Sequence, residues 1–148
     1  MCMNLKKSNL TVITFIIQLL LVITFSFEDK SQNINVDSLL SALQNAKDDT
    51  NKVNLYGKVI DHYTNANYDS ALIFCSPALQ LAEKLKWHEG TAYMKYFCGR
   101  VYWRKGNFDQ ALKYHFDALT YYRNNKNWHM VIRLLTSIGQ DYADGGKY

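Results

Sequence analysis

The chain contains 148 residues, of which 48% are hydrophobic and 14% are aromatic, with only seven Gly and one Pro. This composition provides apolar side chains for one core and excludes a disordered or collagen-like chain. The formal net charge is +4, and the basic residues are scattered among acidic ones, so the sequence predicts a mixed solvated surface and no nucleic-acid-binding face.

The first segment, residues 1–27, has the pattern of an export signal. Lys6 and Lys7 precede an uncharged apolar run over residues 10–25, and Thr24 and Ser26 supply small residues at its end, as in a secretory signal peptide. The run also approaches the roughly 20 apolar residues of a membrane-spanning helix, so an uncleaved membrane anchor is the alternative. Both interpretations predict that the rest of the chain is exported, either periplasmic or membrane-anchored facing the periplasm. A flexible linker is expected over residues 28–35.

A short amphipathic helix is predicted over residues 36–47. Apolar residues recur there at helical spacing, and Asn35 or Asp37 supplies a cap at its start. We interpret this helix as an N-terminal cap on the structure that follows. Asp48 and Asp49 then provide the start signal of the next helix.

Three further segments, residues 52–86, 92–125 and 132–148, align with one another at an offset of 40 positions. Within each segment, apolar residues recur at intervals of three and four, which is the period of one helix face. Asn, Asp and Gly residues interrupt the first two segments near the middle and supply a turn and a helix cap. Each complete segment is therefore predicted to be a pair of helices.

The recurring residues resemble the signature of the tetratricopeptide repeat (TPR), which combines Leu-Gly-x-x-Tyr in the first helix with Ala-x-x-x-Phe in the second. The resemblance implies an all-α fold, a right-handed α-solenoid of helix-turn-helix hairpins over residues 36–148. Gly and Ala would lie where two helices approach closely. The residues that carry the resemblance are Ala71, Ala78, Gly99, Tyr102, Gly106, Phe108, Ala111, Ala118, Gly139 and Tyr142.

The sequence departs from the family pattern in several features. Its period is 40, whereas about 34 is usual, and Val59 replaces the small residue of the first repeat. Cys75 and His115 stand where the second helix usually carries an aromatic residue. Pro77 falls inside the second helix of the first repeat, where a proline costs about 3 kcal/mol or bends the helix.

The third repeat ends after its first helix. Its apolar residues Leu134, Leu135, Ile138 and Tyr142 are predicted to lack half of their packing partners. Full burial of each such side chain contributes roughly 1.5–3 kcal/mol. We therefore expect the repeat to be truncated and the protein to continue beyond residue 148.

The sequence contains no catalytic motif, so neither enzymatic activity nor a cofactor is expected. The Gly-Gly-Lys sequence at 145–147 lacks the earlier Gly of a phosphate-binding loop. The four His residues lack metal-ligand spacing, and His115 is predicted to pack in the core. Cys75 and Cys98 fall on adjacent predicted helices, as two buried thiols or, in an oxidising compartment, as a disulfide.

In the TPR family the first helix of each hairpin lines a concave groove that commonly holds a peptide, and the resemblance implies such a groove here. Aromatic residues and Arg dominate binding energies at interfaces. Arg100, Arg104 and Arg133 could hold an acidic side chain or a carboxylate. The predicted groove residues are Tyr56, Ile60, Tyr63, Tyr93, Tyr96, Arg100, Trp103, Arg104, Arg133, Thr136 and Gln140.

An export signal followed by a capping helix and TPR-like repeats resembles the N-terminal extracytoplasmic region of bacterial TPR-containing sensor kinases and regulators. The resemblance implies a module that binds another protein or a peptide. It would touch a membrane only through its N-terminal segment or a downstream helix. The alternatives are a stand-alone periplasmic scaffold and an appendage of an enzyme whose catalytic domain lies beyond residue 148. The oligomeric state is left open.

Overall fold

The computed structural model describes residues 35–146, and these form six α-helices and no strand. The predicted leader, and the linker up to residue 34, lie outside the described residues. Within the described range no helix is long and apolar enough to cross a membrane. The helices are α2 (Val36–Asn45), α3 (Thr50–Ala66), α4 (Tyr68–Lys84), α5 (His88–Arg104), α6 (Phe108–Asn124) and α7 (Trp128–Asp144).

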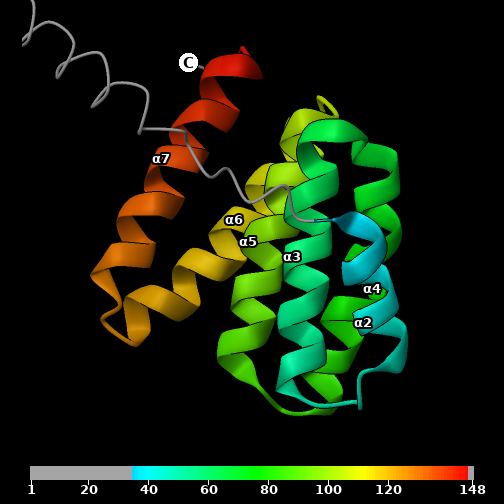
Figure 1. The fold of residues 1–148 in the computed structure, drawn as a ribbon. Helices are drawn as coiled ribbons and strands as arrows, with labels where there is room; N and C mark the ends of the chain where they lie inside the picture. Colours follow the sequence, from blue (N-terminus) through cyan, green and yellow to red (C-terminus); the bar gives the residue numbers. More distant parts are fainter. Residues whose placement is uncertain (1–34, 147–148) are drawn as a thin grey trace, which may run out of the picture. The chain divides into compact units, whose positions relative to one another are not determined.

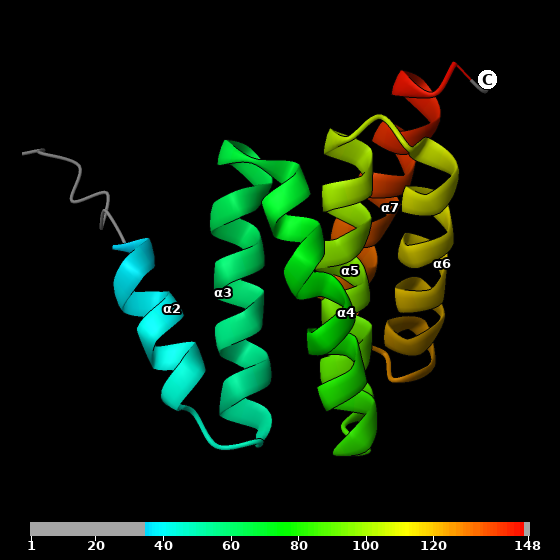
Figure 2. The same cartoon turned by 90° about the vertical axis from the view of Figure 1, so that its right-hand side faces the viewer.

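Consecutive helices run antiparallel and pack side by side (Figure 1). Helices α3 and α4 form one hairpin and α5 and α6 form the next, while α7 packs on α6 and α2 packs on α3 (Figure 2). The first helices of the hairpins also contact one another, α3 with α5 and α5 with α7. The predicted all-α solenoid of TPR-like hairpins is thus confirmed.

The helix boundaries recur at the interval of the sequence repeat. Helix α6 begins and ends at the positions equivalent to those of α4, and α7 begins and ends at the positions equivalent to those of α5. The side chains of Asn67, Asn107 and Asn127 each accept a hydrogen bond from the backbone N–H three residues later and so cap α4, α6 and α7. A residue with positive φ turns the chain after each of the helices α4 to α7, namely Lys86, Gly106, Lys126 and Gly146. Local signals therefore set the hairpin geometry.

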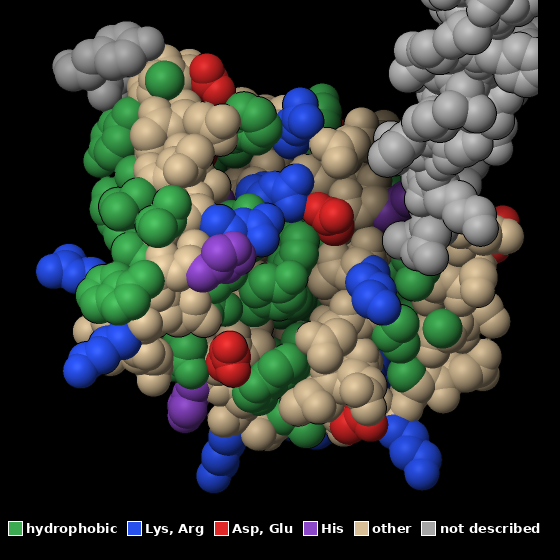
Figure 3. All heavy atoms as spheres, turned by 60° about the vertical axis from the view of Figure 1, so that its left-hand side comes forward, with side chains coloured by type: hydrophobic (Ala, Val, Ile, Leu, Met, Phe, Trp, Pro, Cys, Tyr) green, Lys and Arg blue, Asp and Glu red, His purple; other side chains and the backbone are tan. Residues whose placement is uncertain are grey.

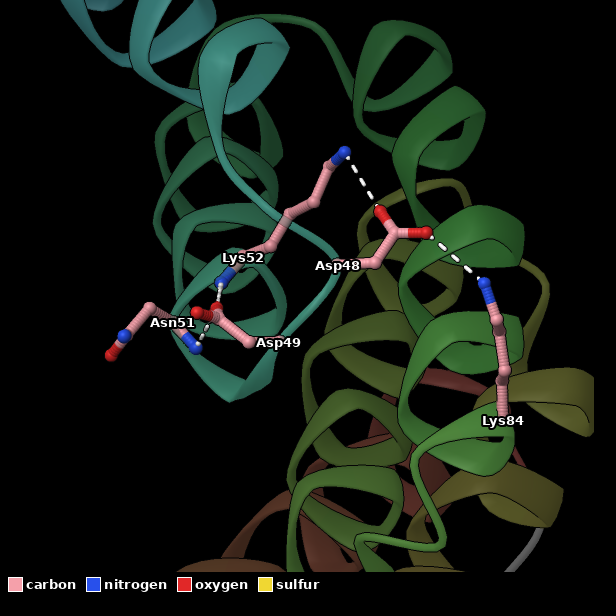
Figure 4. Close-up of polar contacts among 5 residues, drawn as sticks. All are labelled: Asp48, Asp49, Asn51, Lys52 and Lys84. Atoms are coloured by element: carbon pink, nitrogen blue, oxygen red, sulfur yellow. Dashed lines mark hydrogen bonds and ion pairs between the residues drawn. The ribbon is translucent and has the colours of Figure 1, made fainter.

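Two carboxylates fix the connection between α2 and α3 (Figure 4). Asp49 accepts hydrogen bonds from the backbone N–H groups of Asn51 at 2.8 Å and Lys52 at 3.1 Å, which makes it the N-cap of α3, as predicted. Asp48 pairs with Nζ of Lys52 at 3.0 Å and with Nζ of Lys84 at 3.1 Å. These two ammonium groups hold the pKa of Asp48 below its ordinary value. The start of α3 is thereby tied to the end of α4.

The small residues of the repeat signature lie where helices approach closely. A Cβ atom added to Gly99 of α5 would lie 2.5 Å from the ring of His115 on α6, so these two helices pack closely only because that atom is missing. Helix α4 continues through Pro77 without interruption. The signature alanines are fully buried, namely Ala71, Ala78, Ala111 and Ala118.

Helix α7 has one buried and one exposed apolar face. Leu134 and Ile138 are 0% and 6% exposed and belong to the core, so the expectation that they lack half of their packing partners was wrong, because α6 covers them. The same expectation holds for Leu135 and Tyr142, which are 54% and 39% exposed. On the other face, a Cβ atom at Gly139 would meet nothing within 4 Å. The large hydrophobic residues exposed along α7 are Trp128, Ile132, Leu135 and Tyr142.

Candidate partner-binding pocket

Side chains of α3, α5 and α7 converge on a cavity of about 510 Å³, which we call the central pocket. Residues three and four positions apart on a helix share a face. The first helices of successive repeats, α3, α5 and α7, each turn one such face toward the central pocket. Six predicted groove residues line the central pocket, namely Tyr96, Arg100, Trp103, Arg133, Thr136 and Gln140. Its other lining residues are Asp61, His115, Ile132, Ser137 and Asp141. Basic and hydrophobic side chains gather around a hollow in the face shown in Figure 3.

A second cavity, of about 590 Å³, lies between α3 and α5. It is lined by Tyr93, a further predicted groove residue, whose ring meets that of Phe97 edge-on with centroids 4.8 Å apart. Asp61 lines both cavities, so they adjoin one another. The residues that line the two cavities lie mainly on α3, α5 and α7, the first helices of the hairpins.

Four predicted groove residues do not line either cavity. Ile60 is fully buried, and Tyr56 and Tyr63 pack against Phe74 of α4 with ring centroids 6.5 Å and 5.9 Å apart. These three side chains stabilise the first hairpin. Arg104 stacks over the Trp103 ring at 5.0 Å and donates a hydrogen bond to Asn65 Oδ1 at 3.0 Å, which directs it away from the pocket.

The charged groups of the central pocket differ in their pairing. Arg100 Nη1 lies 2.6 Å from Asp61 Oδ1, so this guanidinium already has a carboxylate partner. The Arg133 guanidinium lies 5.5 Å from the centroid of the Tyr96 ring and donates a long hydrogen bond of 3.5 Å to its hydroxyl. No ion pair among the described residues includes Arg133. Its remaining N–H donors are available to an anionic group in the pocket.

A buried His–Asp pair joins α6 to α7 beside the pocket. His115 Nδ1 lies 2.6 Å from Asp141 Oδ2, and both side chains are 1% exposed. His115 was predicted to pack in the core, and it does. Asp141 was not predicted, although it follows Leu134 and Ile138 on the buried face of α7, and that position is the signal that could have found it. Within the described part of the chain, no group of three or more metal-ligating side chains is present.

The remaining signature residues support the framework of the pocket. Tyr102 stacks on Tyr114 of α6, with ring centroids 5.5 Å apart and an angle of 12° between the planes. Phe108 lies beneath Gly145, where an added Cβ atom would come within 3.2 Å of the Phe108 Cβ. Cys75 and Cys98 are buried free thiols on α4 and α5.

In a comparison with known families, residues 26–127 match a model described as the SusR N-terminal TPR domain. This match covers more than half of the chain and spans α2 to α6. No curated protein and no solved structure matches the chain.

Proposed function

Because this chain belongs to the family of SusR N-terminal TPR domains, we propose that it is the extracytoplasmic, partner-binding input region of a membrane-bound bacterial signalling protein. A TPR domain is a protein–protein interaction module, and its repeat fold is a non-catalytic scaffold. The signalling role and the location outside the cytoplasm are the parts that we propose. Two observations support them: the central pocket and the apolar leader.

The central pocket supports binding of a peptide that carries an acidic side chain. Tyr96 and Trp103 offer aromatic surface, and Thr136 and Gln140 offer polar groups at the opposite wall. Of the two arginines that line the pocket, Arg100 is paired with Asp61, and Arg133 is the one that forms no ion pair with a carboxylate of the described residues. A carboxylate placed there would form charge-assisted hydrogen bonds with the guanidinium, which are the stronger class of hydrogen bond. The Arg133 guanidinium, which contacts Tyr96 and has no carboxylate partner among the described residues, is the observation that carries the proposed binding mode.

We expect Arg133→Glu to weaken binding of an acidic peptide by about tenfold or more, which corresponds to about 1.4 kcal/mol or more. The probe is a peptide selected on the immobilised full chain from a random displayed library, and its affinity is measured by fluorescence anisotropy. A version of the peptide with its acidic residue changed to the amide should lose affinity for the wild type and not for the variant.

Arg123→Glu is the matched control for this experiment. It makes the same charge change at an exposed position near the end of α6 and outside both cavities. Binding should survive this change, and both variants should keep the helical circular-dichroism spectrum. Equal losses for Arg123→Glu and Arg133→Glu would show that net charge, and not the central pocket, determines binding.

The leader supports a location outside the cytoplasm, because residues 10–25 are uncharged and follow two lysines. We expect residues 1–35, fused to an alkaline phosphatase whose activity requires its own disulfides, to give an active enzyme in a bacterial host. The variant Leu20→Arg with Leu21→Arg should abolish that activity, since two charges interrupt the apolar run. An inactive wild-type fusion, with the fusion protein present in the cytoplasmic fraction, would contradict export.

A further inference from the structure

Two cysteines meet between the first and the second hairpin. Cys75 of α4 is 5% exposed, and Cys98 of α5 is fully buried. Both belong to the buried core cluster where α4 packs on α5, and Cys75 lies close enough to Cys98 to raise the pKa of its thiol. Beside them lie Tyr102 and Tyr114, whose pKa values burial raises and the neighbouring thiols raise further. The pair is therefore enclosed where α4 packs on α5.

Small side chains flank Cys75 and allow α4 to approach α5. Cys75 lies between Ala71 and Ala78 on the buried face of α4, and both alanines are fully buried. A disulfide requires two Cα atoms within roughly 4.4–6.8 Å of each other. Bulky side chains in place of these two alanines would hold α4 and α5 farther apart, whereas Ala does not.

We propose that Cys75 and Cys98 form a disulfide that joins α4 to α5 when the chain folds in an oxidising compartment. This inference rests on the proposed export, because thiols in a reducing cytoplasm stay reduced. The bond would link the two hairpins covalently at the junction between them. Its position explains why Cys75 stands where the second helix of the repeat usually carries an aromatic side chain.

The oxidant is the disulfide of a thiol–disulfide oxidoreductase of the compartment. One cysteine thiolate attacks a sulfur of that disulfide, which forms a mixed disulfide and releases the first oxidant sulfur as a thiolate. The second cysteine thiolate then attacks the mixed disulfide, and the second oxidant sulfur leaves. The bond between the Sγ atoms of Cys75 and Cys98 is formed, and the two protons lost by the cysteines are taken up by the oxidant, which leaves as a dithiol.

The geometry also determines when the bond forms. Burial raises the pKa of Cys98 well above its usual value, and the neighbouring Cys75 thiol raises it further. A thiol with little thiolate exchanges slowly, and the closed α4–α5 interface excludes an oxidant. Oxidation therefore takes place during folding, before α4 packs on α5. Once formed, the disulfide is shielded from reductants.

The cellular test uses the full chain with Cys2→Ser, so that Cys75 and Cys98 are its only cysteines. One form keeps the leader and the other carries Leu20→Arg with Leu21→Arg. Cells are quenched in acid and denatured, and free thiols are counted with a maleimide reagent before and after reduction. The form with the intact leader should show two thiols only after reduction. The form with Leu20→Arg and Leu21→Arg should show two thiols already before reduction. Cys75→Ala is the matched control and should leave one unpaired cysteine.

A second measurement removes the dependence on export. The purified full chain, again with Cys2→Ser, is refolded in a buffer of oxidised and reduced glutathione. We expect a cross-linked Cys75–Cys98 peptide by mass spectrometry and a Tm about 10 °C above that of the reduced chain, a rise that Cys75→Ala lacks. Oxidised glutathione added after folding should act at least about tenfold more slowly, because of the low thiolate fraction and the closed interface.

The two measurements separate failure of the disulfide from failure of export. Two free or glutathionylated thiols after refolding would overturn the disulfide, wherever the chain is located. A disulfide in the glutathione buffer supports it. If the cross-link forms in that buffer while the cellular chain keeps two free thiols and stays in the cytoplasmic fraction, the proposed export fails and the disulfide chemistry stands.

Discussion

Replacement of Asp141 by Leu is expected to lower the free energy of unfolding by about 3 kcal/mol or more, because it leaves His115 buried without its partner. His115 and Asp141 are each 1% exposed and are joined by a contact of 2.6 Å. At this exposure the two side chains are almost entirely shielded from solvent, although both border the central pocket. Chemical denaturation of the full chain, followed by far-UV circular dichroism, measures the loss.

The double variant Asp141→Leu with His115→Phe tests whether the loss comes from the pair. Replacing both partners of a buried polar contact by apolar side chains of similar size is often neutral. Phe is also the type of residue that the TPR signature places at the position of His115. The double variant should recover most of the lost stability. A double variant as unstable as Asp141→Leu alone would show that the loss comes from poor packing of the new side chain.

Gly99→Ala is expected to destabilise the protein by about 2 kcal/mol, although Ala favours a helix over Gly by up to about 1 kcal/mol. The new Cβ atom would lie 2.5 Å from Cδ2 and Nε2 of His115. The imidazole has little freedom to move aside, because its Nδ1 atom is held by Asp141 at 2.6 Å and the ring is 1% exposed. The new methyl group must therefore push α5 away from α6.

Gly139→Ala is the matched control, since Gly139 occupies the same place in the next repeat as Gly99 does in its own. A Cβ atom there would meet nothing within 4 Å. Only the helix propensity changes, so this variant should be as stable as the wild type or more stable by up to about 1 kcal/mol. Thermal unfolding of both variants distinguishes them, and equal effects would refute the role assigned to His115.

Much of the fold could be predicted because its determinants are local. Three kinds of signal act within a few residues of one another: the helical period, the Asn and Asp caps, and the turn residues. The same signals recur at the regular offset between the segments, which shows that the structure repeats. The groove positions on α5 and α7 follow from the same regularity. Tyr96 and Thr136 occupy equivalent positions, as do Arg100 and Gln140, and all four line the central pocket.

The remaining features depend on contacts between residues far apart in the sequence. Ile60 has the spacing of a groove residue but is fully buried in the first hairpin, because helix periodicity does not specify which neighbour covers a face. Arg104 follows the same row as Arg100, yet it turns toward Asn65 on α3. Asp141 gains its role only from His115, which lies on another helix. Such pairings require the assembled structure.

The two junctions of the stack are chemically distinct. Cys75 and His115 occupy the same place in successive repeats, but the first meets a thiol on α5 and the second a carboxylate on α7. If α6 were docked in the wrong register, or on a first helix other than α7, His115 would be buried without an acceptor, at a cost of about 1–3 kcal/mol. Identical repeats are free to slip or to exchange with those of a neighbouring molecule. In this chain the α4–α5 contact and the α6–α7 contact each pair a different set of side chains. These side chains therefore also specify which hairpin stands next to which in the stack.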